Sequence, residues 1–118
     1  MMRVDIRPRR RNSGKADAER RFPPHIQWLR GRPCLISSTE CDGRMEAAHV
    51  DHAGGKGAGL KVADYKAVPL CQHHHAELHR GPQTFEAAHK VDLVAAARAY
   101  AAKSPHRGRW ADIAGAPR

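Results

Sequence analysis

The chain has 118 residues, a formal net charge of +9 and a hydrophobic content of 41%. Alanine supplies 20 of the hydrophobic residues, whereas Leu, Ile, Val and Phe together number 18, about 15% of the chain and below the roughly 20% at which a globular core becomes doubtful. No apolar run approaches the ~18 residues of a membrane span and the N-terminus lacks the apolar stretch of a secretory signal, so we expect a small cytoplasmic protein without membrane contact, stabilised by more than hydrophobic burial.

The first segment, residues 1–24, contains eight of the 21 basic residues and few large apolar side chains. Its run Arg9-Arg10-Arg11 is typical of a flexible basic arm. Such an arm is either a solvated tail or a non-specific contact for nucleic-acid phosphates. A sequence pI of about 10.2 favours the phosphate contact.

The middle of the chain, residues 25–103, is predicted to be the folding unit, of the α+β class. Short strands are expected over residues 44–50 and 67–70, and Pro69 implies an edge strand or an irregular pairing. The glycine-rich stretch 54–59 between them is expected to be a loop.

Helical patterns follow the second strand. Residues 72–79 suit one or two helical turns that Gly81-Pro82 stops, and residues 84–89 restart a helix. Asp92 is the expected N-cap of a final helix. The apolar residues of this final helix recur at helical spacing and are Leu93, Val94, Ala97, Tyr100 and Ala101.

The last segment, residues 104–118, is predicted to be a second flexible tail. It starts at Ser104-Pro105 and contains one large aromatic side chain, Trp110. The pattern leaves open whether Trp110 docks on the folded body.

The three cysteines, Cys34, Cys41 and Cys71, are an odd number, which disfavours a disulfide scaffold and favours metal ligation. Cys34 and Cys41 lie across a polar turn, while Cys71 and His74 have the C-x-x-H spacing of a zinc knuckle. Because zinc takes four such ligands in a tetrahedron, we predict a structural Zn²⁺ held by these four side chains. The alternative is that the cysteines are small buried hydrophobic residues, which would leave the thin core without a metal to stabilise it.

Five of the nine histidines lie between residues 52 and 79. His75 and His79 are four residues apart, so on a helix they project from one face, where they either share a second metal ion or form a solvated polar surface. His49 ends the first predicted strand and is either a site residue facing the space between loop and helix or a structural histidine. His73 is expected to be exposed and has no assigned role.

Together these motifs resemble the HNH endonucleases, and more narrowly the phage and prophage group that includes the RecA-dependent nuclease Ref. The resemblance rests on Cys34 and Cys41, on Ala48-His49-Val50, on Lys61-Val62-Ala63-Asp64 after the glycine-rich stretch, and on the run from Val68 to His75 followed by His79. It covers about residues 33–80 and leaves both tails outside.

The resemblance implies the ββα-metal, or His-Me finger, fold, in which two strands and a helix frame a catalytic divalent ion beside a structural zinc. It implies that His49 is the general base that activates water, a role that suits an imidazole at neutral pH. It also implies that His75 and His79, with Asp64, hold Mg²⁺ or another divalent ion. The implied activity is hydrolysis of DNA phosphodiester bonds to leave a 5′ phosphate and a 3′ hydroxyl, and some relatives require a recombinase such as RecA.

The sequence departs from the commoner pattern of this family in three places. Ala48 stands where an Asp or His, often a metal ligand, precedes the base. The middle asparagine is missing, and Asp64 is the candidate to replace it. Val50-Asp51-His52 forms a rival register, so His52 remains an alternative base or ligand.

The charge distribution suggests how the chain would bind DNA. Lys56 and Lys61 lie in and after the glycine-rich loop and, with the basic run at residues 9–11, are expected to contact phosphates. The loop lacks the G-x-x-x-x-G-K-[ST] order of a nucleotide-binding loop, and the few aromatic residues disfavour a stacking platform for single strands. Two other functions remain open: a zinc-stabilised nucleic-acid-binding protein without catalysis, and an RNase that uses the same site.

Overall fold

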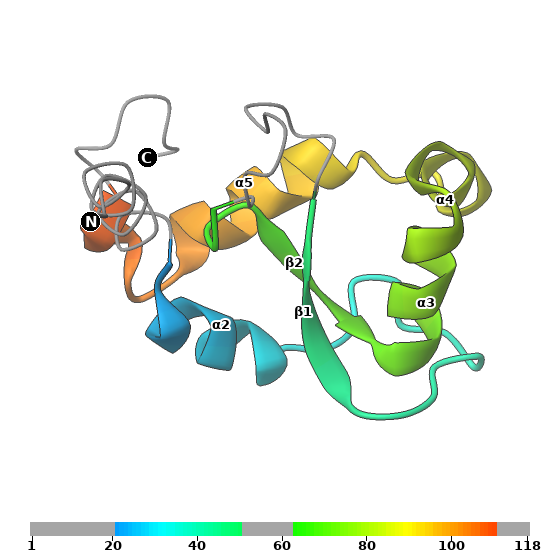
Figure 1. Cartoon of the computed structure of the whole chain (residues 1–118), viewed down its shortest axis with the longest axis horizontal. Coiled ribbons are helices and arrows are strands. Elements are labelled where there is room, and N and C mark those ends of the chain that lie inside the picture. Colours follow the sequence, from blue (N-terminus) through cyan, green and yellow to red (C-terminus); the bar gives the residue numbers. More distant parts are fainter. Residues whose placement is uncertain (1–20, 51–62, 111–118) are drawn as a thin grey trace, which may run out of the picture.

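A computed structural model of the chain describes residues 21–50 and 63–110, as an α+β arrangement of one small sheet and surrounding helices (Figure 1). The elements in chain order are α2 (Pro23–Arg30), β1 (Met45–His49), β2 (Ala67–Cys71), α3 (Gln72–Arg80), α4 (Pro82–His89), α5 (Leu93–Lys103) and the 3₁₀ helix η2 (Arg107–Trp110). None of the helices in the described ranges is long and apolar enough to cross a membrane.

The two strands predicted from the sequence form an antiparallel pair, with Met45 opposite Cys71 and His49 opposite Ala67. Pro69 lies within β2, where its carbonyl accepts a hydrogen bond from the backbone N–H of Leu35 (2.8 Å). In a strand the N–H and C=O of one residue point to the same side. An N–H at position 69 would therefore point toward Leu35 and not toward β1, so proline removes no hydrogen bond between the two strands. This geometry explains how a strand that is buried along its whole length tolerates a proline.

The helices after β2 confirm the predicted pattern. α3 follows β2 without a linking residue, and Gly81 separates it from α4, which begins at Pro82. The Asp92 carboxylate caps α5, because Oδ1 accepts a hydrogen bond from the backbone N–H of Ala95 (3.1 Å).

Helix α2 is an element that the sequence analysis missed, because it interpreted residues up to 24 as part of a basic arm. Pro23 and Pro24 occupy the first turn of this helix, where the missing N–H groups would have no intrahelical partner in any case. Residues 1–20, which hold the basic run, lie outside the described residues.

The core lies between the sheet and helices α3, α4 and α5, while α2 packs against β1 (Figure 1). Its buried members are Cys34, Ala48, Val50, Val68, Leu70, Cys71, Leu78, Phe85, Leu93 and Ala97. Four of these ten are alanine or cysteine, so the core is as thin as the composition predicts.

A second packed region joins the two ends of the described chain. Trp110 is buried, and its ring lies 4.7 Å from that of His25 and 5.5 Å from that of Tyr65, measured between centroids. Ser104 is also buried and shares a hydrogen bond with His25 Nδ1 (3.0 Å). The packed part of the chain therefore continues past residue 103, beyond which a flexible tail was predicted. Trp110 docks on the folded body, a point that the sequence left open.

Burial of His25 predicts a loss of stability in acid. Its side chain is fully buried, and this burial, with a smaller effect of the positive charge of His106, lowers the pKa of His25 from 6.5 to about 4. The unfolded chain therefore binds a proton between these values that the folded chain does not, so the stability falls as the pH drops through this window. Between pH 7 and pH 5 His25 alone should cost about 2 kcal/mol.

Urea unfolding at both pH values tests this prediction, with His25→Gln as the comparison, because glutamine retains a polar group but does not titrate. The wild type should lose about 2 kcal/mol more than His25→Gln on acidification. Equal losses would show that His25 does not stay neutral in the fold.

Candidate functional site

The four predicted zinc ligands come together at one end of the sheet. The ligand atoms of Cys34, Cys41, Cys71 and His74 all lie within 4.8 Å of one another. From His74 Nδ1 the sulfur atoms lie at 3.6 Å (Cys34), 3.6 Å (Cys41) and 3.2 Å (Cys71). A tetrahedral zinc with Zn–S of ~2.3 Å and Zn–N of ~2.05 Å requires S···N separations of about 3.6 Å. The three free thiols and the imidazole therefore fit a metal ion, as the spacing predicts, and the donor set is consistent with a structural zinc.

Local backbone contacts build this cluster. The turn that carries Cys34 and Cys41 is closed by the Ser37 hydroxyl, which donates to the Cys34 carbonyl (2.5 Å), and by the Cys41 N–H, which donates to the Ser38 carbonyl (3.1 Å). Cys71 is the N-cap of α3, and its sulfur accepts from the backbone N–H of His74 (3.5 Å). Six residues separate Cys34 from Cys41, more than the two to four that usually separate paired zinc ligands. The hydrogen bonds of this turn hold the two cysteines together despite the longer spacing.

The thiols also show the electrostatics of a ligand cluster. Burial raises the pKa of Cys71, but backbone hydrogen bonds from His74 and Asp42 outweigh it and lower that pKa to about 6. At Cys41 the backbone N–H of Ser38 lowers the pKa, yet burial and the neighbouring thiols prevail and raise it. One thiolate thus forms readily and a second is disfavoured beside it, which is the repulsion that a bound cation relieves.

A carboxylate lies next to His74. His74 Nε2 is buried and has no hydrogen-bond partner among the described residues, while the ligand atoms of His74, Glu77 and His89 lie within 4.8 Å of one another. His89 Nε2 donates to Glu77, at 3.0 Å from each carboxylate oxygen. Metal-bound histidines commonly donate their other ring N–H to a carboxylate. Glu77 lies close to His74, but its hydrogen bonds come from His89 and not from His74.

The two α3 histidines form a second candidate metal site. His75 Nε2 and His79 Nε2 lie 3.1 Å apart, and their rings stack with centroids 4.7 Å apart. Two imidazole nitrogens on one ion lie about 3.0 to 3.4 Å apart for a metal–nitrogen distance of ~2.1 Å. His75 Nδ1 donates to Glu46 Oε1 (2.7 Å), so Nε2 is the ring nitrogen left to face His79.

Glu46 is the site residue that sequence reasoning missed. Its hydrogen bond from His75 is the main reason why its pKa is lowered, so the carboxylate is ionised at neutral pH. The carboxylate–histidine arrangement is the one that proteins use to fix the orientation of a metal ligand. A charged residue inside a short predicted strand was the available signal, but its partner lies 29 positions away in the sequence.

His49 has a different carboxylate partner. His49 Nε2 donates to Asp64 Oδ1 (2.9 Å), and Asp64 Oδ2 accepts from the backbone N–H of Phe22 (2.6 Å). Burial raises the pKa of Asp64, but these two hydrogen bonds outweigh burial and lower it. Asp64 is therefore an ionised, mostly buried carboxylate, whereas the His49 side chain is 37% exposed.

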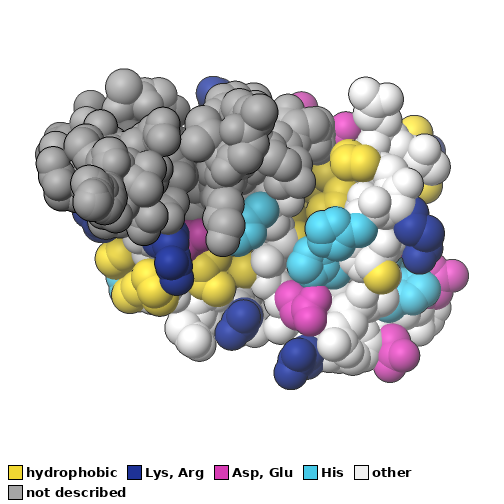
Figure 2. All heavy atoms as spheres, in the orientation of Figure 1, with side chains coloured by type: hydrophobic (Ala, Val, Ile, Leu, Met, Phe, Trp, Pro, Cys, Tyr) yellow, Lys and Arg dark blue, Asp and Glu magenta, His cyan; other side chains and the backbone are white. Residues whose placement is uncertain are grey.

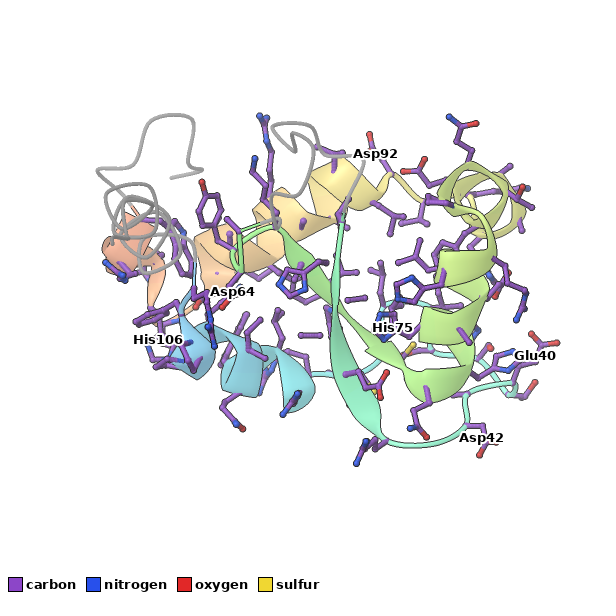
Figure 3. The ribbon with its side chains drawn as sticks, in the orientation of Figure 1. Glu40, Asp42, Asp64, His75, Asp92 and His106 are labelled. Atoms are coloured by element: carbon purple, nitrogen blue, oxygen red, sulfur yellow. The ribbon has the colours of Figure 1, made fainter. Side chains whose placement is uncertain are left out.

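The structure groups the predicted site residues in two pairs on different faces of β1. Side chains alternate along a strand, so His49 lies on the face opposite to Glu46. In Figure 3, Asp64 and His75 lie on opposite sides of β1. Among the described residues no hydrogen bond joins His49 to the α3 pair, and Asp64 is paired with His49 instead of with His75 and His79 as the resemblance implied.

Other predicted residues can be placed only in part. His73 is exposed, as expected. Ala48, which stands where relatives often have a metal ligand, is fully buried in the core. His52, Lys56 and Lys61 lie outside the described residues, as do Arg9, Arg10 and Arg11.

Residues 15–104, most of the chain, match a family described as "Protein of unknown function (DUF968)". The chain belongs to this family. It is similar to the "Uncharacterized protein YdfU" of Escherichia coli (strain K12), with 32% identity over 62 residues. That match covers 52% of this chain but only 17% of YdfU. The chain therefore matches only a small part of this longer relative. No solved structure matches the chain.

Proposed function

We propose that the chain is a metal-dependent endonuclease of the HNH type that hydrolyses DNA phosphodiester bonds. The observation that carries this proposal is the partly exposed imidazole of His49, held by the ionised carboxylate of Asp64 at the end of β1. The order β1, β2, α3 also supports a ββα-metal unit, since α3 contacts both strands and carries the paired imidazoles. The net charge of +9 suits a polyanionic substrate.

In the proposed mechanism Asp64 fixes the tautomer of His49. Because Nε2 donates to the carboxylate, Nδ1 keeps its lone pair and takes a proton from water. The water attacks the scissile phosphorus opposite the leaving 3′ oxygen and the P–O3′ bond breaks. The leaving oxygen takes a proton from solvent, which yields a 5′ phosphate and a 3′ hydroxyl. Asp64 then stabilises the imidazolium that forms, and its own hydrogen bond from Phe22 keeps it in position.

The second proposed component is the histidine pair of α3. His75 and His79 would hold a divalent ion, with Glu46 fixing the ring of His75. Such an ion, when bound, would neutralise negative charge on a DNA phosphate at this pair. Two imidazole donors favour a first-row transition ion over Mg²⁺, which prefers oxygen ligands.

Plasmid nicking tests the proposal. Purified, zinc-loaded chain should convert supercoiled DNA to nicked circles with Mn²⁺ or Mg²⁺ and should be inactive after these ions are chelated. A chain that shifts DNA in a gel but cuts with no divalent ion would instead be a binding protein. Cleavage of RNA in preference to DNA would assign the same site to an RNase. Activity only with an added recombinase such as RecA would retain the nuclease and add a partner.

Removal of Glu46 should weaken the second metal site specifically. Glu46→Ala leaves His75 without the carboxylate that orients it, and loss of such a partner lowers metal affinity by about 10- to 100-fold. Calorimetric titration of zinc-loaded protein with Mn²⁺ measures the change. Asp92→Asn, which removes an exposed carboxylate but keeps the N-cap of α5, is the control and should bind Mn²⁺ as the wild type does. Unchanged affinity in Glu46→Ala would show that the pair does not depend on this carboxylate.

A further inference from the structure

A depression of about 450 Å³ lies along β1, outside the paired edge of the sheet. The end of α2, the start of β1 and the first turns of α3 form its walls. Its lining residues are Arg30, Arg44, Met45, Glu46, Ala47 and His75. Neither the sequence motifs nor the proposed mechanism uses its two arginines.

The charges of this depression favour an anionic ligand. Glu46 is its one acidic side chain, and it is shared by His75 (2.7 Å) and by Arg44, whose Nε lies 3.7 Å from Oε2. The Arg44 side chain is 80% exposed, and Arg30 is exposed and makes no ion pair within the described ranges. The two guanidinium groups therefore outnumber the one carboxylate, and both are exposed to a ligand although Arg44 is also paired with Glu46. Figure 2 shows basic, acidic and histidine side chains next to one another on this face.

We infer that this depression binds the phosphodiester backbone of DNA, with Arg30 and Arg44 as the phosphate contacts. Guanidinium groups match phosphate oxygens in charge and in fork geometry. Glu46 is less exposed than Arg44 (27% against 80% of the side chain) and repels a close anion. The phosphate contacts are therefore expected at the exposed arginines.

These phosphate contacts would lie next to the second candidate metal site. His75 lines the depression and also faces His79, so a strand bound along β1 passes the second metal site. Phosphate contacts of this kind fix the register of a duplex without reading its sequence. The role of these contacts in positioning DNA for cleavage rests on the proposed function. The binding of DNA by the two arginines does not.

Fluorescence anisotropy with a short DNA duplex tests the inference on the full, zinc-loaded chain without added Mn²⁺ or Mg²⁺, so that no cleavage occurs. The double variant Arg30→Gln with Arg44→Gln should raise the Kd by about tenfold, and the slope of log Kd against log salt should fall by about 2. The matched control is Arg98→Gln with Lys103→Gln, which removes the same charge from exposed positions of α5. It should change the Kd by less than about twofold and leave the slope unaltered.

Each outcome decides the inference. Equal weakening by both double variants would show a general charge effect and overturn it, as would unchanged binding by the Arg30/Arg44 variant with zinc content and thermal unfolding intact. An RNA duplex that displaces the DNA at a lower concentration than DNA itself would overturn the assignment to DNA. A wild-type chain that binds through these arginines but never cuts would refute the nuclease and leave this site standing.

Discussion

Replacing His74 with alanine should abolish zinc binding and unfold the chain, whereas the same change at the adjacent His73 should leave both unaffected. His74 is fully buried among three thiols, while His73 is exposed on the same helix. A structural zinc contributes on the order of 10 kcal/mol in small domains. The whole folding free energy of a domain is about 5–15 kcal/mol, so a core this thin cannot replace the metal.

Zinc content by atomic absorption and thermal unfolding followed by circular dichroism measure this effect. Wild type and His73→Ala should contain one zinc per chain and unfold in a single transition that a chelator abolishes. His74→Ala should contain none and show no cooperative transition. A wild-type chain that folds without zinc and is indifferent to chelators would refute the structural metal.

The second large effect is expected at His49. Substitution by alanine removes the proposed general base and should lower the rate of DNA cleavage by about 10² to 10⁴-fold. Asp64→Asn keeps a hydrogen-bond acceptor at the same place but removes the charge that stabilises the imidazolium, so its rate should lie between wild type and His49→Ala. Nicking rates at saturating DNA, with Mn²⁺ present, measure both changes.

Two controls make the His49 result specific. His49→Ala should retain the zinc content of the wild type, because His49 lies at the end of the strand pair remote from Cys71, and it should bind duplex DNA with unchanged Kd. His52→Ala tests the rival register. If His52→Ala abolishes cleavage and His49→Ala does not, the base has been misassigned, and the His49–Asp64 pair is structural.

Features set by short-range spacing could be predicted well from the sequence. The C-x-x-H step from Cys71 to His74 spans one turn at the start of a helix, so both ligand atoms face the same point. The N-cap of α5 depends only on Asp92 and the next three residues. Neither feature needs information from elsewhere in the chain.

Features that depend on distant segments could not be predicted in this way. Helix α2 begins with two prolines and is stabilised mainly by packing on β1 and on the aromatic cluster of Trp110, so its local pattern was ambiguous. The hydrogen bond from His75 to Glu46 spans 29 positions, and its existence depends on how α3 folds back along the sheet.

The sequence by itself thus predicted the four side chains of the Cys3His cluster, the two strands and the three helices that follow them. Only the tertiary structure decided that Asp64 pairs with His49 and that Glu46 accepts a hydrogen bond from His75. Side chains alternate along β1, so His49 and Glu46 point to opposite faces and meet different partners. It also brought Arg30 and Arg44, which are 14 positions apart, to the rim of one depression. Spacing along the chain specifies which side chains share a turn, whereas packing of distant segments around the core specifies which turns meet.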